Sequence, residues 1–404
     1  MKITRRSLLP AMIAAALLLP VVTVWADAPR NVILMIGDGM GFEPVKAASL
    51  YATGKEGGLS FERHHRGEMM THPLAVGDSK TPVTDSAAAG TAMATGRKTT
   101  NKRISQTPDG EDMQTVLEFL AGQGKWTGLV TTAPMTHATP ATFGAHAGQR
   151  TDYSDIAECY FTRSRPNVLF GAYFAKGAGV TGQKATDAGY TVVKTRDEMN
   201  AFVEKARQAG AGETVEPLHV SGQFAAGMIP WEYAEPVNVK RKLAYANKTA
   251  ATCETTPHLS EMTDAALALL ARGPKGFFLM VEGGTIDWAG HDNVIEWSVF
   301  ETVEFAKACQ AAFDWAKGRS DTLIIVTADH ETGDLKVVEG RGKDHFPEVT
   351  WGSRGHTAAN VPVYGVGVGA ERLKGTIDNT DLWPVMTGAD KPAPAPAEPA
   401  AVAN

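Results

Sequence analysis

The chain has 404 residues, of which 43% are hydrophobic and 21% charged, and a formal net charge of −6. This is the composition of an ordinary globular protein, and its excess of acid argues against a basic groove for nucleic acid. The three cysteines, Cys159, Cys253 and Cys309, are too few and too widely spaced for a disulfide framework or a thiolate zinc site, and leave room for one bridge at most.

The first thirty residues have the layout of a secretory signal. A basic start with Arg5 and Arg6 precedes an apolar run over residues 8–24, and small residues follow. We expect cleavage after Ala26, which would remove three basic residues and change the formal charge from −6 to −9. The start also fits a twin-arginine signal. No later segment is long and apolar enough to span a bilayer, so the mature protein is expected to be periplasmic or secreted.

Five short apolar runs have the length and flanks of buried parallel strands. They cover residues 31–36, 127–132, 276–281, 322–327 and 361–366. Helical patterns lie between them, and the clearest is TPHLSEMTDAALALLARG, with Pro257 suited to the first turn and Gly273 to the end. This alternation predicts an α/β fold, a three-layer sandwich whose central, mostly parallel sheet is flanked by helices.

The chain ends in a stretch rich in proline and alanine, residues 388–404. It lacks a periodic apolar pattern, so we expect it to be disordered. The remaining residues, 27–387, are enough for one large domain or two small ones.

Three of the predicted strands run into an acidic residue. The runs that begin at residues 31, 276 and 322 continue as GDG, EGG and ADHETG, which place Asp38, Glu282 and Asp329 just past the strand ends. A single acid in this position is usually a turn residue or a helix cap. In an open α/β sheet, however, the carboxyl ends of the strands form the ligand crevice, so these three acids are expected to converge there.

Histidines add ligands with metal-like spacing. In TIDWAGHDN, Asp287 and His291 are four residues apart, which places both on one face of a helical turn. His330 follows Asp329 directly, and His356 precedes the last predicted strand in RGHTAAN. Imidazole and carboxylate without cysteine suit zinc in a catalytic site. We expect ordinary core or surface hydrogen bonds for the other histidines outside the motifs, which are His64, His65, His72, His146, His219, His258 and His345.

The number of acids in the predicted crevice points to more than one cation. Like charges a few ångströms apart in a partly buried site repel one another strongly. Several divalent ions are therefore the economical explanation for four carboxylates in one place. A site with two metal ions suits phosphoryl transfer.

Ser86 stands at the head of SAAAGTAMATG, a good short helix with Gly96 as its stop. No G-x-S-x-G elbow surrounds Ser86 and no histidine lies near it in the sequence, so alone it is expected to be a helix cap or a packing residue. Beside two metal ions, a coordinated serine hydroxyl needs no histidine base, because its pKa falls. Free N–H groups at such a helix start would also face a phosphate. Gly90 and the alanines would let the helix approach the sheet closely.

These motifs together resemble the alkaline phosphatase family, in the superfamily that also holds sulfatases and phosphodiesterases. IGDGMG, TDSAAAGTAMATG, THATPA, VEGGTIDWAGHDN, TADHETGD and RGHTAANVPVYG follow the family's order over nearly the whole mature chain. The resemblance implies metal-dependent hydrolysis of phosphate monoesters to an alcohol and inorganic phosphate, by one domain over residues 27–387. It also implies small phosphomonoester substrates and a homodimer.

The resemblance implies two zinc ions and one magnesium ion, and assigns their ligands. The zinc that activates the leaving-group oxygen, and later the water, has ligands that match Asp287, His291 and His356. The zinc that activates the serine has ligands that match Asp38, Asp329 and His330. Asp38 also bridges to a third site, usually magnesium, whose other protein ligands match Thr139 and Glu282.

The resemblance also assigns the groups that handle phosphate. Ser86 matches the nucleophile that takes the phosphoryl group and yields it to water, with net retention at phosphorus. Arg150 lies at the sequence distance from Thr139 expected for the arginine that forks onto two phosphate oxygens, and Asp85 matches the residue that orients it. Without the resemblance, Arg150 would be a surface arginine, Thr139 a turn residue and Asp85 a helix cap.

Two residues depart from the best-known enterobacterial member. His137 stands at the third metal site in place of an aspartate, and Trp288 stands at the substrate in place of a lysine. Neutral imidazole holds the water shell of magnesium less well than a carboxylate, so His137 would weaken or change magnesium binding. Trp288 removes a cation and so predicts weaker inhibition by phosphate. Residues 153–257 match the family only loosely and are expected to form a variable insertion or crown of peripheral loops.

Other functions stay open. A phosphodiesterase of the same superfamily usually has a threonine nucleophile and lacks the arginine clamp, so Ser86 with Arg150 favours monoesters. A sulfatase needs a C/S-x-P-x-R signature, which no cysteine here begins. A non-enzymatic periplasmic protein that binds metal or phosphate would explain the histidines and carboxylates, but not a serine at a helix start aimed at them.

Overall fold

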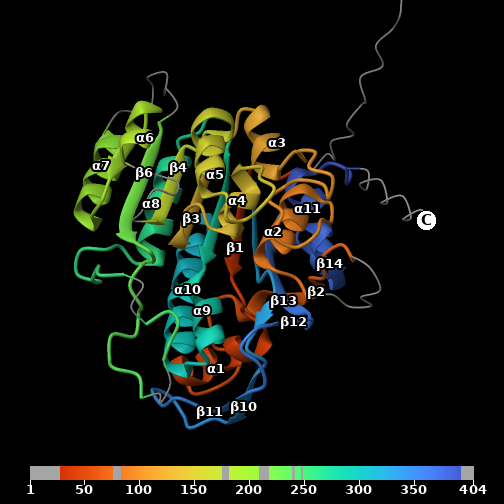
Figure 1. Ribbon diagram of the computed structural model, residues 1–404, viewed down its shortest axis with the longest axis vertical. Coiled ribbons are helices and arrows are strands. Elements are labelled where there is room, and N and C mark those ends of the chain that lie inside the picture. Colours follow the sequence, from red (N-terminus) through yellow and green to blue (C-terminus); the bar gives the residue numbers. More distant parts are fainter. Residues whose placement is uncertain are drawn as a thin grey trace, which may run out of the picture.

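A computed structural model describes residues 28–75, 83–174, 182–208, 218–238, 242–246 and 249–392. One large sheet runs through the middle of the described residues (Figure 1). From one edge to the other, its ten strands are β14 (Gly375–Asp378), β2 (His65–Met70), β13 (Val361–Gly367), β8 (Thr322–Thr327), β1 (Asn31–Gly37), β7 (Phe277–Gly283), β3 (Trp126–Pro134), β4 (Val168–Tyr173), β6 (Val220–Ala226) and β5 (Thr191–Val193). No described helix is long and apolar enough to cross a membrane.

The centre of the sheet is parallel. Strand β1 pairs in parallel with both β7 and β8, so that Ile33 lies beside Leu279 on one side and Ile324 on the other. Every residue of these three strands is buried, which explains why each is a continuous apolar run in the sequence. Because the three strands point the same way, the residues that follow them meet at one edge of the sheet.

Two details of the predicted strands were wrong. The strand predicted at residues 361–366 is β13, which pairs antiparallel with both β8 and β2. Its apolar run shows that it is buried, but burial alone does not set strand direction. Glu282 belongs to β7 rather than following it, whereas Asp38 directly follows β1.

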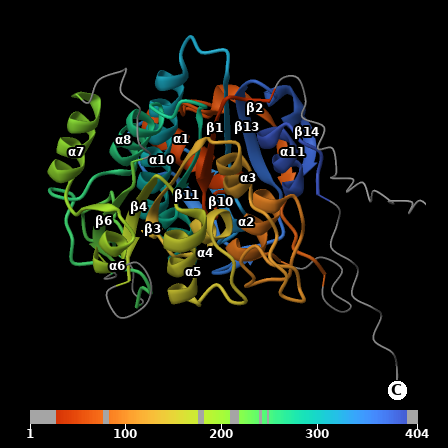
Figure 2. The ribbon, with the colours of Figure 1, turned by 90° about the horizontal axis from the view of Figure 1, so that it is seen from above.

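Helices cover both faces of the sheet, as the view in Figure 2 shows. On one face lie α8 (Leu259–Leu270) and α10 (Ile295–Ala316), with α1 (Phe42–Thr53) and α7 (Arg196–Gln208) packed against them. On the other lie α2 (Ser86–Thr95), α3 (Val116–Gly122), α4 (Ala138–Gly144) and α11 (Leu382–Thr387). The predicted α/β sandwich is therefore confirmed. The helix predicted around residue 257 begins later, since His258 is the N-cap of α8 and Pro257 precedes it.

Shorter elements complete the described part of the chain. Two small antiparallel pairs lie outside the main sheet, formed by β10 (Leu335–Glu339) with β11 (Glu348–Trp351) and by β9 (Glu331–Thr332) with β12 (His356–Thr357). The β10–β11 pair lies near α1 at one end of the molecule (Figure 1). The remaining helices are α5 (Tyr153–Cys159), α6 (Gly182–Asp187) and α9 (Thr285–Asp292).

The segment 153–257 is more than a set of peripheral loops, which corrects that expectation. It supplies β4, β5 and β6, which extend the central sheet at one edge. It also contributes a stretch that lies against α9 and the start of α10, where the ring of Trp231 stacks on that of Trp297 with centroids 4.2 Å apart. This stretch brings residues of the segment close to the motif around His291.

The predictions for the two ends fall partly outside the described residues. The predicted signal over residues 1–26 lies outside them entirely. The predicted disordered tail begins too early, because Ala389 is buried and Lys391 Nζ lies 2.6 Å from Asp381 Oδ1. Residues 393–404 of that tail lie outside the described part. Each of the three cysteines is unpaired.

Candidate active site

Ser86 is the first residue of α2 and faces the carboxyl edge of the sheet. The carboxylate of Asp85 caps the helix by accepting a hydrogen bond of 3.0 Å from the N–H of Ala88. Gly96 ends the helix with a positive φ of 69°, which glycine adopts without strain. Every residue of α2 is buried, and the Oγ of Ser86 lies 3.2 Å from Nε2 of His330. The predicted helix and the position of Ser86 at its start are both confirmed.

Small residues in α2 allow a close helix contact, but the contact is with α4 rather than with the sheet. A Cβ atom added to Gly90 would lie 2.5 Å from the Oγ1 of Thr142 in α4. The predicted approach of Gly90 to the sheet was therefore wrong. The pairing of α2 with α4 matters for the site because α4 carries Thr139, while Arg150 follows in the same connection.

A first group of ligand atoms forms where β1 and β8 end. Nε2 of His330 lies 3.4 Å from Oδ1 of Asp38 and 3.2 Å from Oδ2 of Asp329. All three side chains are fully buried. Asp329 is held in place by its Oδ1, which accepts a hydrogen bond from the N–H of Gly39. These donors lie close enough together to hold one metal ion.

The carboxylates of this first group have too few hydrogen-bond donors to offset their negative charge. Oδ1 of Asp38 and Oδ2 of Asp329 accept no hydrogen bond from the described residues. Burial, reinforced by the charge of Asp329, raises the pKa of Asp38 well above its usual value, and burial with the charge of Asp287 raises that of Asp329 to about 6. Burial also lowers the pKa of His330. Two buried carboxylates beside a neutral imidazole form an environment that a divalent cation would stabilise.

A second group lies beside the first and comes from α9 and β12. Nε2 of His291 lies 3.3 Å from Oδ2 of Asp287 and 3.2 Å from Nε2 of His356. Nε2 of His356 is also 3.5 Å from Oδ1 of Asp287. The predicted placement of Asp287 and His291 on one helical turn is confirmed, since both belong to α9. The ring of His356 stacks on that of His330, with centroids 3.6 Å apart, so the two groups adjoin.

Backbone carbonyls set the orientation of both histidines in the second group. Nδ1 of His291 donates to the carbonyl of Arg354 over 2.6 Å, and Nδ1 of His356 donates to that of Thr84 over 2.9 Å. With Nδ1 engaged, each ring presents Nε2 to the group, which is the usual support for a metal-binding histidine. Burial alone would lower the pKa of His291, but its hydrogen bond to Asp287 raises it to about 9, and the same pair holds the pKa of Asp287 well below its usual range.

A third group combines Asp38 with residues of β7 and the start of α4. Oγ1 of Thr139 donates to Oδ2 of Asp38 over 3.4 Å, and Thr131 donates to Oε2 of Glu282. Oε1 of Glu282 and Nδ1 of His137 have no hydrogen-bond partner in the described part of the chain. Burial raises the pKa of Glu282 to about 7 and, with the charge of Arg150, lowers that of His137 to about 3. The free carboxylate oxygen and the neutral ring nitrogen are unused ligand atoms.

Arg150 places one cation at the rim of these groups. Its Nη1 lies 3.1 Å from Oδ2 of Asp85, and its Nη2 lies 3.5 Å from Nε2 of His137. Asp85 accepts a further hydrogen bond from the N–H of Lys102, so its orientation is held from three sides. Although burial opposes it, the carboxylate of Asp85 raises the pKa of Arg150, which stays charged. A guanidinium held this way can bind two oxygens of a phosphate.

Trp288 lies between His137 and a tyrosine that sequence reasoning missed. Its ring meets His137 edge to face at 5.9 Å, and Tyr245 stacks on it at 5.0 Å. Tyr245 belongs to the segment 153–257, where no motif marks it.

Thr332 was also missed, although it stands two residues after His330. Its Oγ1 donates to Oδ1 of Asp287 over 2.5 Å and so links the first two groups.

A fourth possible ligand group lies away from the others and includes His258. It joins His258 to Glu232 and Glu304, and the hydrogen bond of His258 to Glu232 is of the ordinary kind expected for this histidine. Its carboxylates are already partnered, because Glu232 bonds His258 at 2.8 Å while Glu304 accepts from Ser260 and pairs with Lys307. This group is therefore explained as a structural network.

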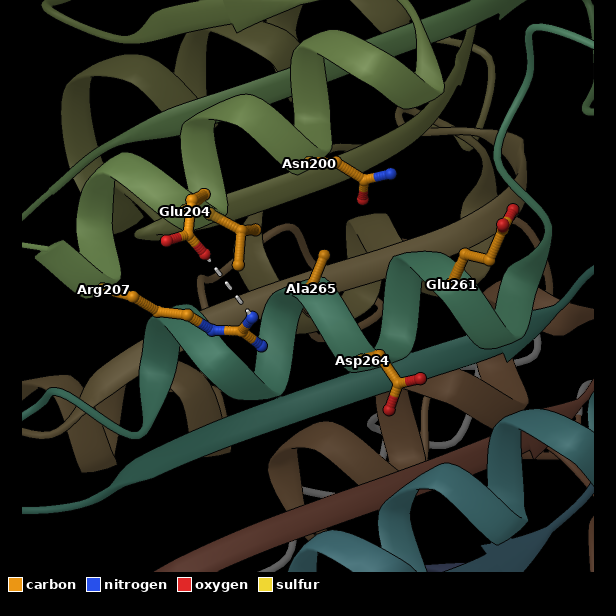
Figure 3. A pocket seen from close by; sticks show the side chains of 7 residues that line it. Asn200, Glu204, Arg207, Glu261, Asp264 and Ala265 are labelled. Atoms are coloured by element: carbon orange, nitrogen blue, oxygen red, sulfur yellow. Dashed lines mark ion pairs between the residues drawn. The ribbon is translucent and has the colours of Figure 1, made fainter.

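A groove of about 370 Å³ between α7 and α8 also lies apart from the ligand groups (Figure 3). Glu204, Arg207 and Asp264 are among the side chains that line it, and Glu204 pairs with Arg207. None of the predicted site residues lines this groove. The chemistry of the chain is concentrated at the sheet edge instead.

Known proteins are similar to this chain in sequence and in structure. A family model described as alkaline phosphatase matches residues 29–166 and 179–347. Alkaline phosphatase 4 of Bacillus subtilis is 33% identical over an alignment that covers 87% of each chain. The crystal structure of a cold-active alkaline phosphatase from a psychrophilic Shewanella is similar with a TM-score of 0.72 and 26% identity, over 88% of this chain and 98% of that one. A mutant of TAB5 alkaline phosphatase, with a histidine changed to aspartate and Mg bound in its M3 site, is similar with a TM-score of 0.69 and 25% identity, over 90% and 98%.

Proposed function

The chain belongs to the alkaline phosphatase family and is a metal-dependent hydrolase of phosphate monoesters, and we propose that it works by transferring the phosphoryl group to Ser86. The observation that carries the proposal is the place of this hydroxyl, at the start of α2 and 3.2 Å from His330 within the adjoining ligand groups. A structural serine at a helix start would be expected to cap the helix, but here Asp85 does so.

We propose two zinc ions and one magnesium ion for the three ligand groups. Asp38, Asp329 and His330 would hold one zinc, and Asp287, His291 and His356 the other. Magnesium would be held by Asp38, Thr139 and Glu282, with His137 beside it. The unpaired oxygens of Asp38, Asp329 and Glu282 fit this proposal, because buried carboxylates without partners require a cation. Bound metal ions would neutralise these carboxylates and lower the pKa of a coordinated hydroxyl.

Different residues of the chain would bind the phosphate group and attack phosphorus. Arg150, oriented by Asp85, would bind two phosphate oxygens, while the N–H groups at the start of α2 face the same phosphate. Ser86 Oγ would lose its proton to solvent and attack phosphorus as the bond to the alcohol oxygen breaks, and the alcohol would leave with a proton from solvent. Water would then attack the phosphoserine and lose a proton to solvent, the P–Oγ bond would break, the serine oxygen would take up a proton, and inorganic phosphate would leave. Two displacements at phosphorus give net retention of configuration.

Ser86→Ala is the test of this proposal. With zinc and magnesium supplied, the variant should lose at least about 10³-fold in turnover of p-nitrophenyl phosphate, because the nucleophile is gone. Acid-quenched wild-type protein should carry phosphate on the peptide that contains Ser86. Ser221→Ala is the matched control, since Ser221 is an equally buried serine in β6 outside the ligand groups, and it should keep its turnover. A Ser86→Ala variant that turns over at the wild-type rate would refute the phosphoserine route.

The choice of ester separates the two branches of the superfamily. Wild-type protein should cleave p-nitrophenyl phosphate much faster than bis(p-nitrophenyl) phosphate. A monoester has three unesterified oxygens, so one remains for the cations when Arg150 binds the other two, whereas a diester has only two. Preference for the diester would remove Arg150 from its proposed role. Binding of metal and phosphate without turnover of either ester would instead support a binding protein.

We propose that His137 weakens magnesium binding at the third group. The TAB5 mutant in which a histidine is replaced by aspartate binds Mg in its M3 site. His137→Asp should likewise increase the magnesium affinity of this chain, measured by calorimetry on zinc-loaded protein, because a carboxylate holds magnesium's water shell better than imidazole does. An unchanged magnesium affinity would contradict this assignment.

We also propose export to the periplasm or the medium, and a homodimer. The support for export is the pattern of residues 1–26 in the sequence, and the support for a homodimer is the family resemblance alone. Secretion of a fusion that carries residues 1–40 ahead of a reporter tests the first. Light scattering coupled to size exclusion tests the second, and a monomeric mass would refute it.

A further inference from the structure

An aromatic pair lies beside the second ligand group, and one member comes from a distant part of the chain. The ring of Tyr245 stacks on that of Trp288, with centroids 5.0 Å apart and planes 16° apart. The same tyrosine ring lies 6.3 Å from that of His291. Trp288 is only 6% exposed, whereas Tyr245 is half-buried. Tyr245 is therefore the member of the pair that keeps more solvent-accessible surface.

The backbone of Tyr245 is held by a fully buried carboxylate. Asp292 is 0% exposed and accepts hydrogen bonds from the N–H groups of Ala244 and Tyr245, over 3.0 Å and 2.9 Å. It also accepts from Nη2 of Arg354 over 3.0 Å. One side chain thus joins residues of the segment 153–257 to α9 and to the loop before β12.

The same carboxylate is connected to a proposed metal ligand. Nε of Arg354 donates to the carbonyl of His291, and the carbonyl of Arg354 accepts from Nδ1 of His291. Asp292, Arg354 and His291 therefore form one network, which gives Tyr245 a defined position relative to His291. An aromatic ring held this way next to a reacting centre is a preorganised contact, because little conformational entropy is lost when a ligand packs on it.

The electrostatics agree with this placement. Burial raises the pKa of Tyr245 to about 12, with further contributions from the charges of Asp287, Asp292 and Asp38, while the charge of Arg150 opposes them. The phenol ring lies against Trp288 and His291. A neutral ring suits a neutral, planar part of the substrate rather than the phosphate itself.

We propose that Tyr245, backed by Trp288 and positioned by Asp292, forms a subsite for the alcohol portion of the substrate and selects phosphate monoesters of aromatic alcohols. The inference rests on the proposed function, together with the family resemblance that matches His291 to a ligand of the metal ion at the leaving group. Stacking on Tyr245 should favour an aryl over an alkyl group by about 2- to 12-fold, the equivalent of about 0.5–1.5 kcal/mol.

Two non-hydrolysable analogues test the subsite without depending on the rate of turnover. The inhibition constants of phenylphosphonate and methylphosphonate are measured against p-nitrophenyl phosphate with the metal-loaded protein. Their ratio reports the aryl preference and cancels the shared phosphonate contacts. In Tyr245→Ala this preference should fall by about 2- to 12-fold, while Tyr245→Phe should keep it because the ring remains.

Tyr233→Ala is the matched control. Tyr233 belongs to the same segment but packs edge to face on Phe300 and Phe346, away from the ligand groups. Its loss should leave the aryl preference unchanged even where stability falls. A preference that survives in Tyr245→Ala, or that falls equally in Tyr233→Ala, would overturn the subsite. Failure of both phosphonates to inhibit, together with no turnover of monoesters, would overturn the proposed function and the subsite with it.

Asp292→Asn tests the positioning role separately. Asparagine keeps one oxygen acceptor but can no longer accept from all three donors, so Tyr245 should lose its fixed place and the aryl preference should fall. If Asp292 acts through Tyr245, the same substitution should have no further effect on the preference in a Tyr245→Ala background. An equal effect in both backgrounds would show that Asp292 does not position Tyr245.

Discussion

Replacing Glu282 by glutamine would test whether its buried carboxylate is retained for a cation. Glu282 is fully buried, Thr131 donates to its Oε2, and its Oε1 is unpaired. Burial is the largest cause of its raised pKa, with the charge of Asp329 in support and the hydrogen bonds of Thr131 and Thr139 in opposition. Glutamine has the same shape and keeps an acceptor for Thr131, so the substitution chiefly removes the charge.

The size of the effect follows from the pKa. A carboxyl whose pKa is higher in the folded than in the unfolded protein binds its proton more tightly when folded, so ionisation lowers the free energy of unfolding. For Glu282 this loss begins above the usual pKa of 4.5 and is nearly complete once the pH has passed the folded value of about 7. At 1.36 kcal/mol per pKa unit, the metal-free protein should lose about 3 kcal/mol by pH 8 and about 1 kcal/mol or less by pH 5. Because Asp38 and Asp329 also titrate, we expect Glu282→Gln to recover about 2–3 kcal/mol at pH 8.

The assay is urea unfolding followed by tryptophan fluorescence, with and without a chelator. Without metal, Glu282→Gln should be more stable than wild type at pH 8 and nearly equal at pH 5. With zinc and magnesium, the order at pH 8 should reverse, because the variant has lost a ligand. Glu301→Gln is the matched control, since burial also raises the pKa of Glu301, to about 8, but this residue lies outside the three ligand groups. A metal-free Glu282→Gln protein no more stable than wild type at pH 8 would refute the reasoning.

Three further changes have defined outcomes. Trp288→Lys restores a cation near phosphate and should lower the phosphate inhibition constant about fivefold, the equivalent of about 1 kcal/mol, so an unchanged constant would contradict it. The hydrogen bond that His258 donates to Glu232 raises the pKa of His258 above its usual 6.5, so the stabilisation is complete below pH 6.5 and is lost as the pH rises through the folded value. His258→Asn should therefore lower the urea midpoint by the equivalent of about 0.5 kcal/mol at pH 6, with a difference that narrows by pH 9. Gly90→Ala would place a Cβ 2.5 Å from Oγ1 of Thr142, and urea unfolding should show a net loss of about 1–2 kcal/mol, because the clash exceeds the gain in helix propensity.

The sequence predicts those parts of the fold whose cause is local. The central strands are buried on both faces and therefore appear as continuous apolar runs, and α2 has a capping residue at Asp85 and a glycine stop at Gly96. The direction of β13 is not local, because it depends on which neighbours the strand pairs with. The position of Glu282 within β7 shows a similar limit, since hydrogen bonding and not polarity decides where a strand ends.

The residues that sequence reasoning missed act through contacts across long sequence separations. Asp292 reaches Ala244 and Tyr245 through backbone N–H groups, which any residue could supply and which leave no trace in the sequence. Tyr245 lies in a stretch without a helix or strand pattern, so nothing indicates which way its ring points. By contrast, Asp287 and His291 lie within one turn of α9, where sequence spacing and spatial distance agree.

Some buried carboxylates in the described part of the chain have protein partners for their oxygens, and others do not. This difference is informative about function. Asp292 and Glu304 are buried within the described part of the chain, and each accepts hydrogen bonds or pairs with a cation. Asp38, Glu282 and Asp329 are equally buried, yet each has an oxygen that accepts nothing from the described residues, as does Glu331, which follows His330. The chain can therefore satisfy a buried carboxylate by its own groups, but at the sheet edge it does not. An unpaired charge is tolerated in a protein interior where an external ion completes it, so the three oxygens of Asp38, Glu282 and Asp329 support the proposed metal site more directly than sequence spacing does.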